Sequence, residues 1–403
     1  MGDFMQNILV KRKTYLERLA QARDKHIIKV ITGVRRGGKS TPLLQYRQML
    51  IAQGIREEQI LSIHLDWLES EPLLEYHTLY DHIKKHLQKD CTTYIFLDEV
   101  QLVPDFQKAV LSIFEQDNVD IYLTGSNAGL LSGELATLLS GRYIELPLYP
   151  LSFKEYCDLC GKPALEAWNE YFSWGGFPYL SQIPSEEIRL DYLSGIYHTV
   201  LIKDIMERRN IQDAGKLNRV VKFMLDNIGN PVSAKKIADT LTSSGHKTSS
   251  STIDHYLQTL CDAFILYPCA RYDVQGKQHL KTQQKYYAAD PGFRKLLIGN
   301  TGRDIGHILE NIVYLELLRR GFHVSIGKIG PLEIDFIAQK GNSRTYYQVS
   351  ASILDPNTFQ REIHPLKQVP DNYPKYLLTL DTLPMEEDGI LHENIVEWLL
   401  KGP

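Results

Sequence analysis

Cysteine is scarce in this sequence, and long apolar runs are absent. The 403 residues include five cysteines, too few for a disulfide framework, which argues against a disulfide-stapled secreted fold. Cys157 and Cys160 have the C-x-x-C spacing, but Cys261 and Cys269 are spaced wrongly to complete a zinc site, so we interpret all four as buried or incidental thiols. The longest apolar runs are strand-sized, far below the roughly 20 residues of a membrane span. Charge enters the N-terminus by Lys11, which excludes an apolar signal region there, and we expect a cytoplasmic protein without membrane contact.

An excess of positive charge is also missing. The chain carries 45 Lys+Arg against 49 Asp+Glu, a formal net charge of −4. With no overall basic footprint, any contact with nucleic acid has to come from local patches. The sequence shows no internal repeat and no low-complexity linker. Because 403 residues exceed one comfortable core, we expect two to four domains packed against each other.

Strand-length apolar runs alternate with helical stretches through the first part of the chain. This alternation predicts an α/β domain over residues 1–152, built on a mostly parallel sheet with helices on both faces. The expected strands are 26–33, 60–66, 94–99, 121–126 and 143–148, and the expected helices include 8–25, 42–53, 75–89 and 105–116.

The remaining chain divides by pattern into three segments. Residues 153–212 are helical and are interrupted by WGGFPYL at 174–180. Residues 213–300 give helices, two of them with serine N-caps at Ser233 and Ser249, and then a strand hairpin, which is a winged-helix pattern. Residues 301–403 begin with a helix and continue as a strand-rich module.

The stretch GVRRGGKST, residues 33–41, fits G-x-x-x-x-G-K-[ST] directly after a strand and before a helix. Glycines in such a loop let backbone N–H groups face the β-phosphate, and the helix N-terminus adds partial positive charge. Lys39 would bridge the β- and γ-phosphates, and the Ser40 hydroxyl would hold Mg²⁺. We therefore expect ATP and Mg²⁺ to bind at Gly33, Gly37, Gly38, Lys39, Ser40 and Thr41.

Pro42 departs from the usual pattern of this loop. Proline loses no hydrogen bond in the first helical turn, but it biases the preceding residue, Thr41, away from helical geometry. The N–H of Thr41 is expected at the α-phosphate, so the affinity for nucleotide, not the fold, is in question.

The stretch YIFLDEVQ, residues 94–101, supplies the acids that hydrolysis requires. Asp98 ends a strand and is placed to hold the magnesium shell. Glu99 is the natural base for orienting and deprotonating the attacking water. The next strand ends in LTGSN, so Ser126 or Asn127 can sense the γ-phosphate from a neighbouring strand.

Arg142, in the segment LLSGRYIELPLY, is the best candidate for an arginine finger. A positioned finger is worth about 10³–10⁵ in rate. The alternative is a structural arginine that opens the last strand of the sheet.

Several segments together resemble one family. They are VITGVRRGGKST, IFLDEVQ, the stretch from LTGSN to FKEY, WGGFPYL, TVLIKDI and LENIVYLELLRRG…EIDF. The chain is similar along nearly its whole length to bacterial and archaeal AAA-type ATPases that carry a C-terminal domain of uncharacterised function. The resemblance implies an ATPase core, a winged-helix segment and an end domain similar to the PD-(D/E)XK nuclease fold. It implies no substrate.

The winged-helix pattern raises the possibility of DNA contact. The N-terminal end of its last helix, the end that enters the major groove in such modules, reads HKTSSST and offers one cation, Lys247. Lys277, Lys281 and Lys285 on the hairpin suit phosphate contacts that carry no sequence information. The alternative is a protein-interaction module or a rigid spacer.

The end domain has the skeleton of a metal nuclease site. Such a site needs an acid on a helix, an Asp at a strand end, and E-x-K on the next strand, where i and i+2 share a face. Glu310 and Asp335 match the first two positions, but Gln348 replaces the second carboxylate and Ser350 replaces the lysine. A lysine displaced to another strand, such as Lys328 or Lys340, would be needed to restore the chemistry, so we predict a nuclease-like domain without the reaction.

The sequence thus predicts an ATPase that couples nucleotide state to a C-terminal half that handles nucleic acid without cleaving it, in a chain able to form homo-oligomers. One alternative is a nucleotide-gated switch, in which slow hydrolysis times a DNA- or protein-bound state. Another is an ATP-gated metal-dependent nuclease.

Overall fold

A computed structural model describes residues 10–402, apart from 129–138, 140, 201–204, 207–210, 212, 300–303 and 384; for 279–283 only the backbone is described. The chain divides into two compact units, Met1–Leu148 with Asp262–Phe264, and Tyr149–Cys261 with Ile265–Pro403. Among the described residues, none of the helices has both the length and the apolar character to cross a membrane.

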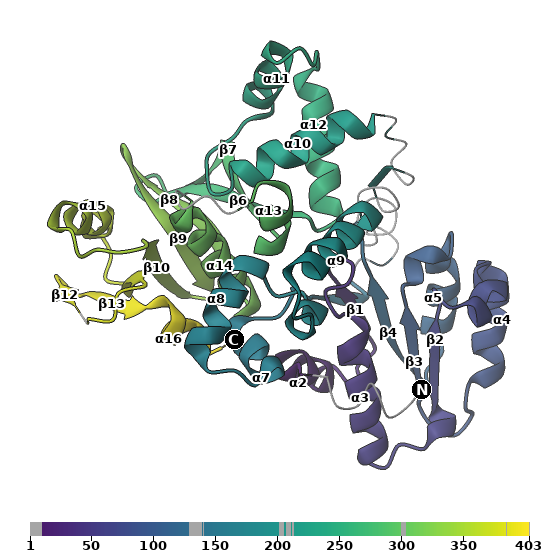
Figure 1. Ribbon diagram of the computed structural model, residues 1–403. Helices are drawn as coiled ribbons and strands as arrows, with labels where there is room; N and C mark the ends of the chain where they lie inside the picture. The colour runs from purple at the N-terminus through teal and green to yellow at the C-terminus, as the bar shows by residue number, and fades with distance from the viewer. Residues whose placement is uncertain are drawn as a thin grey trace. The chain divides into compact units, whose positions relative to one another are not determined.

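The first unit is built on a five-stranded parallel sheet, as the alternating pattern predicts. Its strands lie in the order β2-β3-β4-β1-β5 (Figure 1). Helices cover both faces, so the central strands have almost no polar alternation; all residues of β1 and β3 are buried. The strands are β1 (Ile28–Thr32), β2 (Ile60–His64), β3 (Thr93–Asp98), β4 (Val119–Gly125) and β5 (Tyr143–Pro147).

Each face of this sheet has its own apolar cluster. On one face, side chains of α4 (Tyr76–His86) and α5 (Phe106–Phe114) pack on the strands. On the other, side chains of α2 (Lys13–Gln21) and α3 (Ser40–Ala52) do so. Short 3-10 turns complete the unit: η1 (Glu57–Gln59), η2 (Leu68–Leu73) and η3 (Val100–Leu102). Parallel strands bring their carboxyl ends to one edge of a sheet, so the ends of β1, β3 and β4 share that edge.

The second unit begins with helices. The two expected serine caps are confirmed: Ser233 accepts the Lys236 N–H at 3.3 Å, and Ser249 accepts the Thr252 N–H at 3.1 Å. The helices are α7 (Phe153–Cys160), α8 (Ala164–Trp174), α9 (Glu186–Thr199), α10 (Ala214–Asp226), α11 (Ala234–Ser243), α12 (Ser250–Asp262) and α13 (Pro291–Leu297), with the turn η5 (Pro178–Gln182).

The WGGFPYL segment is explained by one buried carboxylate. Asp290 accepts the N–H of Gly176 at 2.6 Å and that of Gly292 at 2.8 Å. Gly175 has φ +81°, and a Cβ built on it would lie 1.7 Å from Asp290 Oδ1. A Cβ on Gly176 would lie 2.4 Å from the carbonyl oxygen of Leu151. Gly175 is therefore required by its positive φ and by the approach of the Asp290 carboxylate, and Gly176 by close backbone approach.

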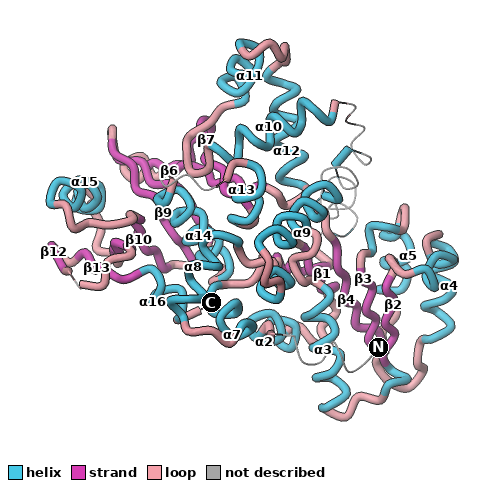
Figure 2. The backbone as a smooth tube through the Cα atoms, viewed as in Figure 1, coloured by secondary structure: helices cyan, strands magenta, loops and turns pink. Residues whose placement is uncertain are grey.

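An eight-stranded mixed sheet completes the second unit, in the order β12-β13-β11-β10-β9-β8-β6-β7. Figure 2 draws its strands in magenta. Its β6–β7 hairpin is the one that the sequence pattern assigned to the wing. Strand β6 pairs antiparallel with β7 and also parallel with β8, so the hairpin belongs to the same sheet as the C-terminal strands. The strands are β6 (Leu266–Asp273), β7 (Gln278–Ala288), β8 (His323–Ile329), β9 (Leu332–Lys340), β10 (Ser343–Val349), β11 (Lys375–Thr379), β12 (Glu386–Glu387) and β13 (Ile390–Asn394).

Helices α14 (Ile305–Arg319), α15 (Pro356–Lys367) and α16 (Ile395–Leu400) accompany this sheet. In α14, buried Glu316 pairs with Arg319 at 3.6 Å and with Arg320 at 3.0 Å, as its helical spacing predicts. Glu316 is thereby accounted for as a structural ion pair.

Candidate functional site

The phosphate loop connects β1 to α3. Gly33 has φ +152°, and a Cβ there would lie 2.1 Å from the Leu148 carbonyl oxygen, so the loop can leave β1 in this direction only through glycine. Gly38 has φ +92° just before the lysine. Lys39 is 4% exposed, and its Nζ lies 3.4 Å from the Val34 carbonyl oxygen. The loop therefore holds a buried cation at the carboxyl edge of the sheet.

Pro42 does not prevent α3 from starting where the motif requires. The helix begins at Ser40, and the Thr41 N–H donates to the Gly38 carbonyl oxygen at 3.2 Å. Pro42 is buried in the first turn, where its missing N–H has no intrahelical partner to lose.

Asp98 ends β3 and is held from three directions. Thr124 on β4 donates its hydroxyl to Asp98 Oδ1, and His64 Nδ1 at the end of β2 lies 3.2 Å from Oδ2. Burial alone would raise the pKa of the Asp98 carboxyl. Hydrogen bonds from His64, Thr124 and Ser40 outweigh this, and the pKa lies below its usual value. Asp98 is therefore an ionised acceptor beside Ser40.

This donor set fits a divalent cation. Ser40 supplies a hydroxyl and Asp98 a carboxylate, the oxygen ligands that Mg²⁺ prefers. His64, Asp66 and Asp98 each offer a ligand atom within 4.8 Å of the others. Ser40 and Asp98 are thus the residues that would hold Mg²⁺, which there would neutralise phosphate charge.

Glu99 follows Asp98 and faces the lysine of the loop. Its Oε1 lies 3.2 Å from Lys39 Nζ, although β4 separates their strands in the sheet. Burial alone would raise the pKa of the Glu99 carboxyl, but the charge of Lys39 and a hydrogen bond from Gln101 bring the pKa below its usual value. Glu99 is therefore ionised and able to accept a proton.

The end of β4 supplies polar groups from the neighbouring strand. Ser126 donates its hydroxyl to Glu99 Oε2 at 3.2 Å, and Asn127 beside it is 8% exposed. Gln101 and Thr124 also contact the acids, but the sequence analysis did not select them. The YIFLDEVQ and YLTGSN segments contain them at strand ends, and that position is the only sequence signal that marks them.

Arg142 lies away from this group within one chain. It immediately precedes β5, and its backbone oxygen accepts the N–H of Ile28, the first residue of β1. Arg142 thus lies at the amino edge of the sheet, whereas the phosphate loop leaves the carboxyl edge. Its guanidinium pairs with Glu115 at 3.2 Å, and both side chains are largely exposed. A finger role would therefore require a second copy of the chain.

The second unit brings together three of the four residues predicted for a nuclease-like site. Glu310 lies on α14, Asp335 on β9 and Gln348 on β10. The Asp335 N–H donates to Gln348 Oε1 at 3.3 Å, and Asp335 Oδ2 accepts the Val349 N–H at 2.8 Å. Asp335 lies inside β9, not at the strand end that the sequence predicted, because β9 continues to Lys340.

Lys285 on β7 joins this cluster. Its Nζ lies 2.8 Å from Glu333 Oε1 and 3.7 Å from Glu310 Oε2, and the residue is 4% exposed. Gln348 Nε2 donates to Glu362 Oε2 on α15 at 2.9 Å. Glu362 thus brings a carboxylate next to the amide of Gln348. We call the group Lys285, Glu310, Glu333, Asp335, Gln348 and Glu362 the carboxylate cluster.

The carboxylate cluster holds more negative than positive charge. Burial raises the pKa of Glu310 to about 7, with Glu333 and Glu362 adding to the rise and Lys285 opposing it. Burial, and next the charge of Glu310, raise the pKa of Asp335 well above its usual value, again opposed by Lys285. Lys285 is the cation that opposes these shifts, and burial favours the protonated forms of Glu310 and Asp335.

Ser350 and the two lysines proposed for rescue lie elsewhere. Ser350 follows β10, and its hydroxyl donates to the Ser352 carbonyl oxygen at 3.2 Å. Lys340 Nζ donates to the Arg320 carbonyl oxygen at 2.8 Å. Lys328 lies opposite Glu333 in the β8–β9 register but forms no ion pair with it. The lysine beside these carboxylates is Lys285, which sequence analysis assigned to phosphate contact on the wing; that assignment is wrong because Lys285 is buried.

The other lysines that sequence analysis assigned to DNA contact lie at different places. Lys277 is exposed at the hairpin tip, and Lys247 lies before α12. The side chain of Lys281 lies outside the described residues.

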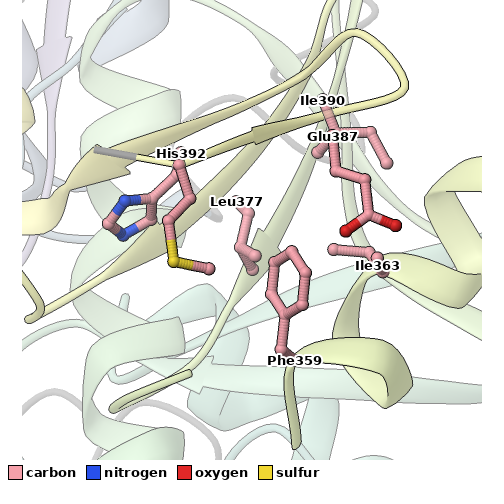
Figure 3. Close-up of a pocket in the computed structure, with 7 residues that line it drawn as sticks. Phe359, Ile363, Leu377, Glu387, Ile390 and His392 are labelled. Atoms are coloured by element: carbon pink, nitrogen blue, oxygen red, sulfur yellow. The ribbon is translucent and has the colours of Figure 1, made fainter. Parts of the chain in front are cut away.

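A small apolar pocket lies between α15, β11 and β13 (Figure 3). His392 Nε2 lies 2.7 Å from Thr379 Oγ1, whereas its buried Nδ1 has no hydrogen-bond partner among the described residues. Hydrocarbon dominates the rest of the lining, so we interpret the pocket as a packing gap. It is lined by Phe359, Ile363, Leu377, Met385, Glu387, Ile390 and His392.

The parallel sheet, the loop with Lys39 and the acids at the end of β3 define a P-loop domain of the AAA type. A family described as an AAA domain matches residues 25–157, and a domain of unknown function, DUF8612, matches residues 165–304. The Walker-type ATPase paby2304 of Pyrococcus abyssi has a similar fold, with a TM-score of 0.53 and 14% identity over 72% of this chain and 96% of that chain.

Two relatives in sequence establish the family. An uncharacterized protein of Haemophilus influenzae is 41% identical over 404 residues, which cover 98% of this chain and 100% of that protein. The uncharacterized protein MJ1544 of Methanocaldococcus jannaschii is 30% identical over 357 residues, which cover 83% of this chain and 77% of that protein. The chain belongs to the family of AAA-type proteins that these two represent.

Proposed function

We propose that the chain binds Mg-ATP and hydrolyses it, and that nucleotide state controls a C-terminal half that handles nucleic acid. The observation that carries the first part is the meeting of Lys39 and Glu99, with Asp98, at one edge of the sheet. Lys39 would hold the β- and γ-phosphates, and Glu99 would orient the attacking water and accept its proton. Ser126 and Asn127 would contact the γ-phosphate from β4.

Phosphate release at millimolar Mg-ATP tests this function. The wild-type chain should hydrolyse ATP, and Lys39→Ala should neither bind nor hydrolyse it. Lys108→Ala is a matched control, because Lys108 is exposed in the same unit and its ammonium contacts Asp105 and the Tyr76 ring, away from the phosphate loop. Absence of both binding and phosphate release in the wild type would refute the ATPase assignment, and retained ATP affinity in Lys39→Ala would refute the role of the loop.

Nucleic-acid handling rests on the order of elements from α10 to β7. Three helices and a hairpin follow the winged-helix order, and Lys247 and Lys277 offer cations for phosphate contact. Steady-state ATPase rates with duplex DNA, single-stranded DNA, RNA and no ligand distinguish two versions of this proposal. A motor should be stimulated by its nucleic acid, whereas a nucleotide-gated switch should bind in one nucleotide state without faster turnover. Binding should weaken steeply with salt, since phosphate contacts dominate.

A second function is favoured by one specific observation, the position of Lys285. The sequence lacks the lysine of E-x-K, yet β7 delivers a buried ammonium to Glu310 and Glu333, beside Asp335. A lysine beside metal-binding carboxylates can orient or activate water, and a divalent cation supplies Lewis-acid chemistry there. The residues that would hold the cation are Glu310, Asp335 and Glu362. We therefore propose metal-dependent phosphodiester cleavage in the second unit as the alternative activity.

Plasmid cleavage in Mg²⁺ or Mn²⁺ tests the alternative. Asp335→Ala and Lys285→Met should abolish it, while Lys328→Ala, on β8 of the same sheet, should not. Glu99→Gln should leave cleavage unchanged if it belongs to the second unit. Intact plasmid with the wild type in both metals would refute cleavage and leave the ATPase proposal untouched.

A further inference from the structure

Gln101 lies two residues after Glu99, in the turn η3, and its amide contacts the Glu99 carboxylate. Gln101 Nε2 donates to Glu99 Oε2 and, at 3.1 Å, to Ser126 Oγ. Ser126 Oγ donates to the same oxygen of Glu99 at 3.2 Å. Two neutral donors thus hold Glu99 Oε2, while Glu99 Oε1 lies 3.2 Å from Lys39 Nζ.

The orientation of the Gln101 amide follows from its partners. An ionised carboxylate only accepts hydrogen bonds, so Nε2 and not Oε1 must face Glu99. Gln101 Oε1 is then a buried acceptor that has no hydrogen-bond partner among the described residues. An unpaired buried acceptor costs about 1–3 kcal/mol, so this arrangement calls for an explanation beyond packing.

The backbone at Glu99 is strained at the same place. Glu99 has φ 55° and ψ 45°, the left-handed region that a residue with a Cβ rarely adopts. Its N–H donates to Thr124 Oγ1 at 2.9 Å, which ties this conformation to β4. Strained backbone and an unpaired polar group meet around one carboxylate, a combination typical of functional positions.

Lys39 Nζ, which lies 3.2 Å from Glu99 Oε1, is also the group that would contact the β- and γ-phosphates of ATP. When its ammonium moves to the β- and γ-phosphates, Glu99 loses its cation and keeps only the donors of Gln101 and Ser126. We propose that Gln101 is a positioning residue for hydrolysis: its Nε2 fixes Glu99 Oε2, so that Glu99 Oε1 and Gln101 Oε1 are the two acceptors for the attacking water. This inference rests on the proposed ATPase function.

The step then balances within this group. Water oxygen bonds to the γ-phosphorus, the bond from that phosphorus to the bridging oxygen of ADP breaks, and Glu99 Oε1 takes the proton. Gln101 takes none, because its amide only holds and orients.

Gln101→Ala and Gln101→Glu test the proposal, with Gln116→Ala as an exposed control in the same unit. Both Gln101 variants should lower kcat for ATP by about 10–100-fold and leave KM and ATP affinity within about twofold, because the interaction acts in the transition state. Gln101→Glu keeps the side-chain shape but replaces the donor by a carboxylate, so it should not rescue. The control should match the wild type.

A double variant separates positioning from a structural role. If Gln101 acts through Glu99, Gln101→Ala should add almost nothing to the loss in Glu99→Gln, measured by single-turnover hydrolysis. Three results would overturn the inference while the ATPase function stands. They are an unchanged kcat in Gln101→Ala, a loss of ATP affinity as large as the loss of kcat, and additive losses in the double variant. A wild type that binds but never hydrolyses ATP would overturn both.

Discussion

Lys39 Nζ lies 3.2 Å from Glu99 Oε1, so the residue assigned to phosphate and the residue assigned to water form an ion pair. The pair spans β4, which lies between their strands in the sheet. Binding of ATP would draw the Lys39 ammonium away from Glu99, because the triphosphate carries more negative charge than one carboxylate. If ATP binding moves Lys39 to the phosphates, the same movement would free Glu99 to act as the base.

Glu99→Gln should bind ATP at least as tightly as the wild type and release phosphate at least about 10²-fold more slowly. The amide keeps the shape but cannot take a proton, and general-base catalysis contributes about 10²–10⁴-fold. Filter binding with labelled ATP and a phosphate-release assay measure the two effects. Normal turnover in this variant would remove Glu99 as the base.

Arg142 should matter to hydrolysis only between copies of the chain. Its position beside Ile28, at the amino edge of the sheet, predicts that Arg142→Ala alone loses activity and that mixing it with Glu99→Gln subunits restores part of it. The mixture can form an interface with one intact base and one intact arginine. No recovery on mixing would favour the structural role that its pairing with Glu115 suggests.

Asp290→Ala should destabilise the second unit by about 2–5 kcal/mol. The change leaves the N–H groups of Gly176 and Gly292 without their acceptor, and each such loss costs about 1–3 kcal/mol. Urea unfolding followed by tryptophan fluorescence measures the shift. Asp226→Ala, at an exposed position at the end of α10, is the control and should change stability by less than about 0.5 kcal/mol.

The carboxylate cluster should make stability fall as pH rises from about 4.5 to about 7. Burial raises the pKa of Glu310 to about 7 in the folded chain, above the usual value of 4.5. The folded state therefore keeps a proton that the unfolded state releases, and this stabilisation is fully present at low pH and lost through that window. Glu310→Gln should reduce the slope, worth on the order of 1–3 kcal/mol, in urea titrations across this range.

A divalent cation should reverse the same trend. Mg²⁺ or Mn²⁺ bound among ionised carboxylates would stabilise the folded state most at neutral pH. A thermal shift in the absence of nucleotide measures this in an Asp98→Asn variant, whose magnesium site beside the phosphate loop is impaired. Identical melting in Mg²⁺ and in chelator at pH 7.5 would argue against a cation in the cluster.

Sequence reasoning performed best where local pattern and spacing decide the outcome. The phosphate loop, the acids after β3 and the polar end of β4 follow from a strand that ends in polar residues, and the parallel strands place them together. Sequence reasoning missed Gln101 because η3 turns this side chain back toward Glu99, and no rule of residue spacing predicts such a turn. The interior position of Asp335 was missed because β9 runs on past the apolar residues to Lys340.

Lys285 was assigned to the wrong role for a topological reason. The residues around it alternate as an ordinary hairpin, and a hairpin after three helices suggests a wing whose lysines face solvent. The pairing of β6 with β8 is a contact between segments about 55 residues apart, as Arg271 opposite Ile326 illustrates. Local pattern cannot reveal such a contact, and it is this pairing that turns an apparent surface lysine into a buried one.

The shared strand β6 also limits how the second unit can move. Strand β6 follows α12, pairs with the lysine-bearing strand β7 on one side and joins the C-terminal strands on the other. A pull on α12 is therefore transmitted through main-chain hydrogen bonds to the strands that carry Lys285 and Asp335. Cutting the chain near residue 300 would separate β6 and β7 from the other strands of the sheet. The strands that carry Lys285 and Asp335 should therefore fold and move together.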